Sequence, residues 1–170
     1  LRERGVPYTV MTSDELARGD LKSRGFRAAI LVRMMAIGQS EADELKRFAS
    51  GGGIVVADAG AGIYDRQLAR HSTGVASELF GVKRESVKFS EYGGRRRQVA
   101  DGRLHFQVEQ GRQSWFPHTS GVGAGPGEAG LVLAGARAEG RFGDTPCLIV
   151  NEAGGGWAVT LNLAISAYSD

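Results

Sequence analysis

The fold is decided by residues 40–65, SEADELKRFASGGGIVVADAGAGIYD. The first part has the period of an amphipathic helix capped by Ser40. Its apolar face carries Ala42, Leu45, Phe48 and Ala49. We expect its charged residues to point outward, at Glu41, Asp43, Glu44, Lys46 and Arg47. The three glycines 51–53 end the helix, and the apolar run 54–57 predicts a buried strand.

The residues before this stretch predict a similar alternation. Residues 8–11 are predicted to form a short buried strand, and Thr12 with Glu15 forms a capping box at the start of a helix. That helix should end at Gly19. Residues 28–32 are a continuous apolar run, which is typical of a strand covered on both faces. Strands and helices alternating over short connections predict an α/β fold with a doubly wound, mostly parallel sheet and right-handed crossovers.

The second half is predicted to be rich in strands. A short helix at residues 76–80 ends at Gly81, and polar and apolar residues alternate at 86–90 and 104–109, which indicates antiparallel hairpins. Further strands are predicted at 131–134, 147–150 and 157–163, with glycines 154–156 joining the last two. The glycine-rich residues 121–130 lack the Lys-Ser/Thr ending of a phosphate loop. We therefore expect a single domain over residues 1–170.

The composition of the chain argues against several classes of function. The chain has 170 residues, 21 basic against 19 acidic, and a net charge of +2, so it carries no general signal for binding nucleic acid. The basic run 95–97 is expected to be a solvated turn. With one cysteine, the chain has no internal disulfide and no cysteine-based zinc site. No apolar run reaches the length of a membrane span. We expect no membrane partner and no cofactor, and we favour the cytoplasm without fixing the compartment.

The chain also resembles a known family. The phrases SDELARGDL (residues 13–21) and SEADELKRFASGGGIVVADAGAGIYD, with the closing strand and Leu161-Asn162, are similar to the class I glutamine amidotransferase fold, which is flavodoxin-like. More closely, they resemble the amidotransferase-like trimerisation domain of large microbial β-galactosidases. The likeness is strong over residues 5–82 and only a pattern of strands beyond. It implies a structural, oligomerising domain that forms a trimer or dimer and follows a catalytic barrel. The charged beginning, residues 1–4, resembles the last turn of a helix and agrees with a fragment of a larger protein.

The residues argue against amidotransferase chemistry. Such enzymes place a cysteine nucleophile at the turn after the third strand, and here Asp58 stands at that degenerate position. Residues 151–170 contain no histidine to serve as its base, and Cys147 lies in an apolar strand where a thiol is inert. We favour a capping role for Asp58, through backbone N–H groups of the next turn. The alternative is a hydrolase that uses Asp58, alone or paired with Asp65, although Asp65 is expected to cap the segment that begins at Arg66.

Several other residues could bind a ligand or a subunit. Gly60 and Tyr64 follow Asp58 on the same turn, while Trp115, Phe116 and His118 form an aromatic cluster before the glycine-rich loop. Such a cluster could stack on a sugar ring, but we favour a core plug or a subunit contact. His71 and His105 are expected to be exposed, and the three histidines lack the spacing of a metal site. Three functions therefore remain: an interaction domain, which we rank first, a carbohydrate-binding module, and a hydrolase.

Overall fold

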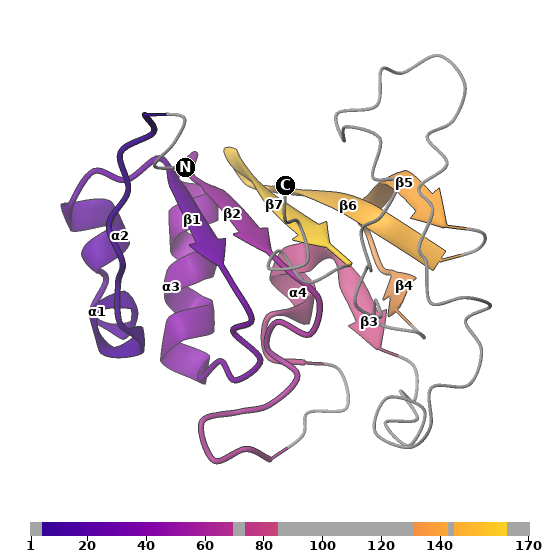
Figure 1. Ribbon diagram of the computed structural model, residues 1–170, viewed down its shortest axis with the longest axis horizontal. Helices are drawn as coiled ribbons and strands as arrows, with labels where there is room; N and C mark the ends of the chain where they lie inside the picture. The colour runs from indigo at the N-terminus through magenta and orange to yellow at the C-terminus, as the bar shows by residue number, and fades with distance from the viewer. Residues whose placement is uncertain (1–4, 70–73, 85–130, 143–144, 163–170) are drawn as a thin grey trace.

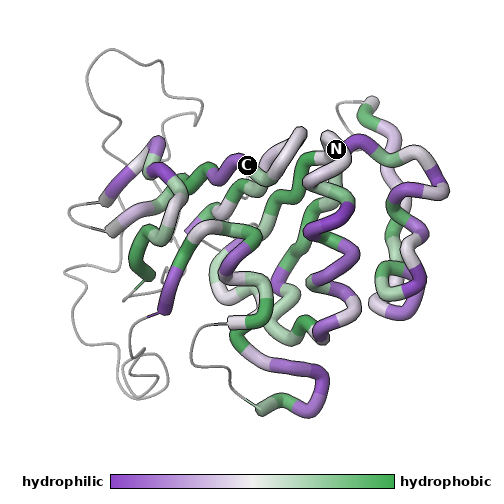
Figure 2. Tube along the Cα trace, turned by 180° about the vertical axis from the view of Figure 1, so that it is seen from behind, coloured by the Kyte–Doolittle hydropathy of each residue, from purple (hydrophilic) through white to green (hydrophobic). Residues whose placement is uncertain are grey.

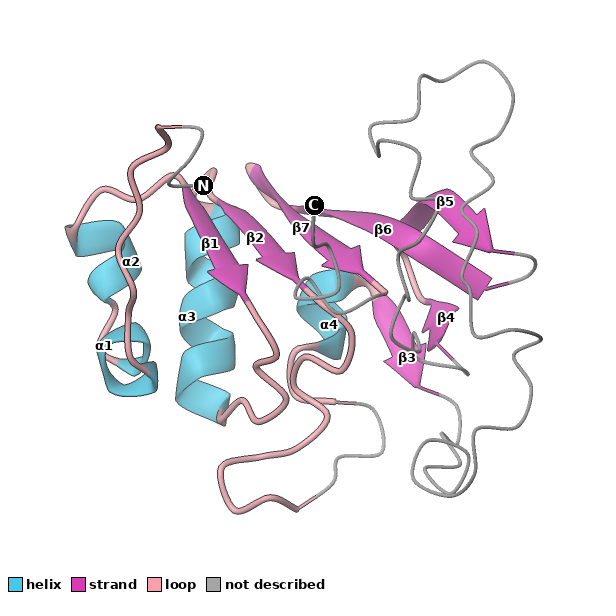
Figure 3. Ribbon diagram, in the orientation of Figure 1, coloured by secondary structure: helices cyan, strands magenta, loops and turns pink. Residues whose placement is uncertain are grey.

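The structure is a computed structural model, which describes residues 5–69, 74–84, 131–142 and 145–162. Within these ranges the helices are α1 (Ser13–Ala17), α2 (Asp20–Ser23), α3 (Gln39–Ser50) and α4 (Ser77–Phe80). The strands are β1 (Ala28–Leu31), β2 (Ile54–Ala57), β3 (Val82–Arg84), β4 (Leu131–Leu133), β5 (Arg137–Phe142), β6 (Thr145–Ala153) and β7 (Gly156–Leu161). The protein is therefore a mixed α/β fold, with few helices beside its sheets (Figure 3).

The main sheet has five strands in the order β1-β2-β7-β6-β5. β1, β2 and β7 run parallel, whereas β6 pairs antiparallel with both β7 and β5. Among the described residues, β3 and β4 form a second, antiparallel sheet. The sequence predicted this combination of a parallel first part and antiparallel additions, including the hairpin through Gly154 and Gly155 that joins β6 to β7.

The described helices lie on one side of the main sheet. Figure 1 shows α3 and α4 behind β1, β2 and β7, with α1 and α2 beside α3. The core lies between the sheet and α3, where Leu45 and Ala49 of the helix and Val55 of β2 are fully buried. Seen by hydropathy, α3 alternates between hydrophilic and hydrophobic residues, as an amphipathic helix should (Figure 2). Helices on both faces, which a doubly wound fold requires, are not seen in the described ranges.

Local signals in the sequence identified most of the helix ends. The capping box at α1 is confirmed, since Thr12 Oγ1 accepts from the backbone N–H of Glu15 and the Glu15 carboxylate accepts from that of Thr12. α4 ends at Gly81, which adopts the left-handed conformation that glycine favours. At α3 the predicted N-cap was two residues off, because the N-cap is Gly38 rather than Ser40 and the helix begins at Gln39.

Three predictions about burial were wrong. Residues 8–11 are not a strand, and Tyr8 and Val10 are 56% and 82% exposed. β1 is covered on one face only, so Ile30 is 45% exposed. Two acidic residues of α3, Glu41 and Glu44, were expected to point outward but are almost fully buried. The predicted strands at 86–90 and 104–109 and the loop at 121–130 lie outside the described residues.

Candidate functional site at the carboxyl edge of the parallel strands

The three parallel strands end together at one edge of the sheet. In the register, Leu31 of β1 lies beside Ala57 of β2, which in turn lies beside Thr160 of β7. The loops that follow the strands therefore begin side by side. In open α/β sheets this carboxyl edge is where ligands usually bind, so it is the natural place to look for a site.

Asp58 is the residue that follows β2, and it is 1% exposed. Its Oδ1 accepts a hydrogen bond of 2.7 Å from the backbone N–H of Arg33, on the loop after β1. Its own backbone N–H donates to the carbonyl oxygen of Leu31 at 3.3 Å. The carboxylate thus binds a backbone N–H of the neighbouring loop. That it also caps the next turn, as the sequence analysis favoured, stays a prediction.

This contact supports an unusual backbone conformation. Arg33 has a φ of 51°, in the left-handed region that side chains other than glycine rarely adopt. Such a conformation costs free energy and persists where surrounding contacts hold it. A charge-assisted hydrogen bond from the Arg33 N–H to Asp58 is a contact of this kind. Asp58 therefore stabilises the backbone conformation of the loop that follows β1.

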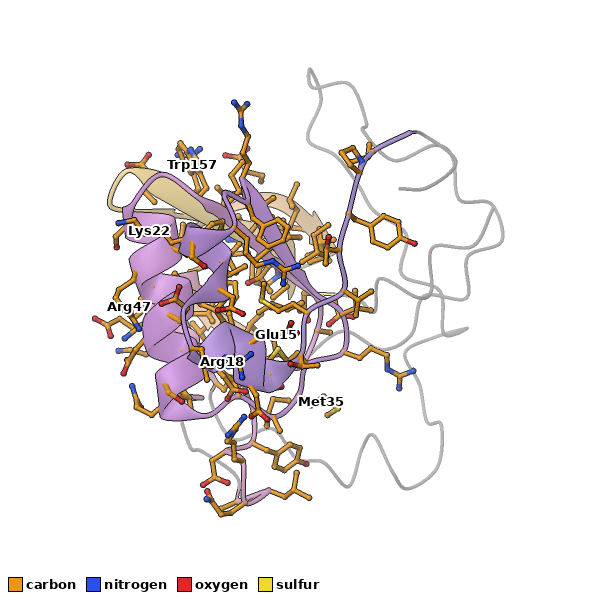
Figure 4. The ribbon with its side chains drawn as sticks, turned by 90° about the vertical axis from the view of Figure 1, so that its left-hand side faces the viewer. Glu15, Arg18, Lys22, Met35, Arg47 and Trp157 are labelled. Carbon is orange, nitrogen blue, oxygen red and sulfur yellow. The ribbon has the colours of Figure 1, made fainter. Side chains whose placement is uncertain are left out.

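The loops after β1 and β2 continue side by side beyond Asp58. The backbone N–H groups of Gly62 and Tyr64 donate to the carbonyl oxygens of Met34 and Met35 at 3.1 and 3.0 Å, and an isolated parallel bridge joins Ala36 to Tyr64. Figure 4 shows Met35 at this end of the molecule, far from Trp157 at the opposite end of the sheet.

The predicted residues Gly60 and Tyr64 therefore lie in one ordered double loop. Gly60 has a φ of +85°, and a Cβ there would stand 3.3 Å from Ile63 Cδ1, so both the turn and its packing favour glycine. Tyr64 is half-buried. Their assignment as ligand or interface residues stays a prediction.

A buried arginine that sequence reasoning missed also holds this loop. Arg84, at the end of β3, is 7% exposed, and its Nη2 donates to the carbonyl oxygen of Ala61 at 3.0 Å while its Nη1 donates to Ser77 Oγ at 3.0 Å. Gly74 packs so closely that a Cβ there would meet Arg84 Nη1. In the sequence, Arg84 follows a lysine and resembles a surface residue. Only the fold brings it to the loop after β2.

The end of β7 adds two more buried polar residues. Asn162 is fully buried, and its Nδ2 donates to the carbonyl oxygen of Pro146 at 3.0 Å. Thr160 is 4% exposed, and among the described residues its Oγ1 has no hydrogen-bond partner. Cys147 is buried in β6, in the apolar setting that the sequence predicted. Asn162, Thr160 and Cys147 are therefore all buried beside this edge of the sheet.

The remaining predicted residues are arranged as follows. Asp65 caps its own turn, as predicted, because its Oδ1 accepts from the backbone N–H groups of Gln67 and Ala69, both at 2.8 Å. The aromatic cluster of Trp115, Phe116 and His118 lies outside the described residues, as do His71, His105 and residues 95–97. Within the described ranges, no group of three or more His, Cys, Asp or Glu side chains could hold a metal ion, and no helix is long and apolar enough to cross a membrane.

A separate cleft lies away from Asp58, between α3, α4 and β3. It has a volume of about 570 Å³ and is lined in part by Lys46, Glu78 and Lys83. Lys46 Nζ donates to Glu78 Oε2, and this hydrogen bond, with the lysine charge, lowers the pKa of Glu78. The acidic group in this cleft is therefore already paired.

Comparison with models of protein families and with curated protein sequences found no match. Solved structures did match. Gan42B, a GH42 β-galactosidase from G. stearothermophilus, aligns over 95% of this chain and 21% of its own, with a TM-score of 0.66 and 18% identity. A β-galactosidase from Rahnella sp. R3 aligns over 85% of this chain and 21% of its own, with a TM-score of 0.61 and 19% identity. An exo-β-1,4-mannosidase from Opitutaceae bacterium strain TAV5 aligns over 85% of this chain and 22% of its own, with a TM-score of 0.52 and 14% identity.

These similarities establish a shared fold. The chain spans about a fifth of the length of the structures it matches. The neighbours include GH42 β-galactosidases, the broader group to which the sequence resemblance pointed.

Proposed function

We propose that this chain is a non-catalytic structural and oligomerisation domain of a β-galactosidase-like glycoside hydrolase, of the amidotransferase-like type. The observation that carries the proposal is the match over 95% of this chain to a 21% portion of a β-galactosidase. In this proposal the catalytic acids belong to a separate barrel domain, and residues 1–170 form one domain that contributes to a trimer or dimer.

The burial and hydrogen bonding of Asp58 support the proposal that this domain is not catalytic. A carboxylate nucleophile must reach a substrate, but Asp58 is 1% exposed and accepts a backbone hydrogen bond from Arg33. Asp65, the other candidate carboxylate, accepts two backbone hydrogen bonds of its own turn. The hydrogen bonds of both carboxylates therefore support a structural role without catalysis.

The proposed oligomeric state is tested by measuring the molar mass in solution. Light scattering over a concentration series should show a trimer or dimer, for this chain alone or for the complete polypeptide that contains it. If both remain monomeric at high concentration, the proposed oligomerisation is wrong.

The absence of catalysis is tested with paired variants in the complete polypeptide. We expect Asp58→Asn to leave hydrolysis of nitrophenyl β-galactoside within about twofold of the parent at a temperature where both are folded, because Asp58 acts on the loop after β1. Asp43→Asn, at an exposed position of α3, is the matched control. A loss of kcat of about 100-fold or more in a folded Asp58→Asn protein, with Asp43→Asn unchanged, would show that Asp58 is catalytic.

A further inference from the structure

The turn at residues 65–69, in the loop after β2, is held in one conformation by its own hydrogen bonds. Asp65 Oδ1 accepts from the backbone N–H groups of Gln67 and Ala69, both at 2.8 Å. The Leu68 N–H donates to the carbonyl oxygen of Asp65 at 3.0 Å, and the Asp65 N–H donates to that of Ala69 at 2.9 Å. Most backbone amides of the turn are therefore bound within the turn itself.

Arg66 joins this turn to two helices. Its Nη2 donates to Asp14 Oδ1 of α1 at 2.9 Å and to Glu41 Oε1 of α3 at 3.3 Å. Glu41 is 1% exposed, so this carboxylate is fixed within the fold. The turn is therefore rigid in itself and held in position relative to α1 and α3.

Leu68 lies at the tip of this turn in a strained conformation. Its φ is 61°, in the left-handed region where glycine and asparagine are favoured, and it is 71% exposed. Figure 1 shows the loop after β2 extending beyond the end of α3, at the bottom of the view. The hydrogen bonds of the turn are made by its backbone and by Asp65, so they do not require a leucine at this position. A strained residue that the local structure does not require indicates a function for its side chain.

The cleft between α3, α4 and β3 can receive such a side chain. Its volume is about 570 Å³, and Val75, Val82 and Ala134 supply an apolar part of its lining. Lys46 and Glu78, which also line it, are paired with each other. An apolar side chain can therefore enter the cleft without separating a carboxylate from its partner.

The turn and the cleft have opposite charge. The described charged residues at the turn are Asp14, Glu41, Asp65 and Arg66. Those that line the cleft are Lys46, Glu78 and Lys83. Carboxylates outnumber cations at the turn, and cations outnumber carboxylates in the cleft. Two such surfaces attract each other and favour a defined orientation.

The turn and the cleft also lie next to each other on one copy of the chain. A Cβ at Gly38 would stand 3.0 Å from Cγ and Cδ of Arg66, and Gln39, the next residue, lines the cleft. Leu68 is too exposed to fill the cleft of its own copy. Because the two features are adjacent, two copies related by a two-fold axis can make the same contact in both directions.

We propose that Leu68 of one copy docks into the cleft between α3, α4 and β3 of a second copy. A two-fold dimer makes this contact twice about its axis, and a three-fold ring makes it once at each interface. The rigid turn loses little conformational entropy on docking, which favours affinity. The inference rests on the proposed function, in which the domain forms a trimer or dimer, and it names the surfaces that meet.

Residues 85–130 of the same copy are the competing occupant of the cleft, because they follow β3, which forms one wall of it. The two occupants predict different behaviour. A segment of the same copy stabilises the domain at every protein concentration. A second copy stabilises it only where copies associate.

Leu68→Asn separates a docking role from a structural one. Asparagine tolerates the left-handed region and keeps the backbone hydrogen bonds, but it removes the apolar side chain. In light scattering of the complete polypeptide over a concentration series, we expect the dissociation constant between copies to rise about tenfold or more. The Tm measured on separated copies should stay the same or rise. Gln67→Ala, at the neighbouring exposed position, is the matched control and should associate like the parent.

Ala134→Arg tests the cleft, because Ala134 is exposed and arginine would fill part of the space beside it. We expect it to weaken association as Leu68→Asn does and to leave the Tm of separated copies unchanged. If it lowers that Tm and leaves association unchanged, a segment of the same copy fills the cleft and the proposal is wrong.

Failure of this inference is distinct from failure of the proposed function. If the parent associates and Leu68→Asn associates as tightly, the proposed oligomer stands and the Leu68 contact is wrong. If the parent remains monomeric at high concentration, the proposed oligomerisation and the Leu68 contact are both wrong.

Discussion

At the scale of single residues, buried polar side chains hold the loops at the carboxyl edge of the sheet. Asp58 accepts from the backbone of Arg33, Arg84 donates to Ala61, and Asn162 donates to Pro146. Each joins parts of the chain that are distant in sequence. Aspartate and arginine are common catalytic residues, but here their side chains stabilise turns. This is the expected role of buried polar groups whose hydrogen bonds are satisfied.

Thr160 is the exception and yields a prediction about stability. Its Oγ1 is buried and has no hydrogen-bond partner in the part of the chain that the structure describes, and an unpaired buried hydroxyl costs free energy. Thr160→Val keeps the shape and removes the hydroxyl, so we expect the free energy of unfolding to rise by about 1 kcal/mol. Thr160→Ser keeps the hydroxyl and loses the methyl group, and should lower stability by about 1 kcal/mol. Chemical denaturation measures both. A destabilised valine variant would mean that the hydroxyl has a partner.

Glu15 yields a prediction about pH. Its pKa is lowered, mainly because its carboxylate accepts the backbone N–H of Thr12 and also the Thr12 hydroxyl. A lowered folded pKa adds stability that is present above the unfolded value of about 4.3 and is lost as pH falls through the folded pKa. Glu15→Gln can keep the capping geometry but not the charge. Its Tm should therefore lie below the parent's at pH 7, and the difference should shrink towards pH 3.

The pH dependence of that difference is what identifies the charge. A gap in Tm between the parent and Glu15→Gln that stays constant from pH 7 to pH 3 would assign the effect to packing. Asp43→Asn again serves as a control, because Asp43 is exposed and its carboxylate accepts from the side chain of Gln39 on the same helix.

At the scale of elements, the sequence predicted what local interactions determine. The apolar face of α3, the capping box of α1 and the hairpin between β6 and β7 all depend on residues close together in the chain. The burial of Glu41 could not be predicted in this way. Its carboxylate accepts from the Gly38 N–H nearby, but also from Arg66, which reaches it from the loop after β2 and contacts Asp14 of α1 as well.

The same distinction between local and long-range interactions explains the other wrong predictions. Residues 8–11 have the composition of a strand, but a strand also needs a neighbour to pair with, and no described strand lies beside them. Glu44 is buried because Gly19, from the turn between α1 and α2, packs against its carboxylate. At the candidate site, Asp58 was identified because it follows a predicted strand, at the position where the resemblance places a nucleophile. Arg84 was not, because β3 reaches the site through the fold.

One close contact between elements gives a third prediction. Gly156 begins β7, and a Cβ there would overlap the carbonyl oxygens of Gly53, which directly precedes β2, and of Ala49, in the last turn of α3. Backbone atoms cannot move aside as a flexible side chain can, so we expect Gly156→Ala to cost about 3 kcal/mol or more in unfolding free energy. Gly140→Ala is the matched control within a strand, because its Cβ would make an ordinary contact with Leu148. Similar Tm values for the two variants would contradict the packing of β7 on α3.

At the scale of the whole molecule, the main sheet is covered unequally. One face packs on α3, while the other exposes Ile30 of β1, Ile54 of β2 and Trp157 of β7. Ile54 and Trp157 are neighbours in the register, and Ile30 lies beside Val56 on the same face, so apolar residues follow one another across the three strands. Contiguous exposed apolar surface of this kind marks a contact with another protein or domain. Under the proposed function, this exposed face is where the rest of the polypeptide would pack.

This face yields the last prediction. The isolated chain should bind a hydrophobic dye such as ANS under native conditions, and the double variant Ile30→Lys, Ile54→Lys should bind markedly less. Val132→Lys is the matched control, because Val132 is 40% exposed but lies on β4, in the other sheet. In the complete polypeptide the difference between parent and double variant should disappear, since the face would already be covered. Equal dye binding by the parent and the double variant in the isolated chain would mean that this face is covered within residues 1–170 themselves, and the argument for an outside partner would fail with it.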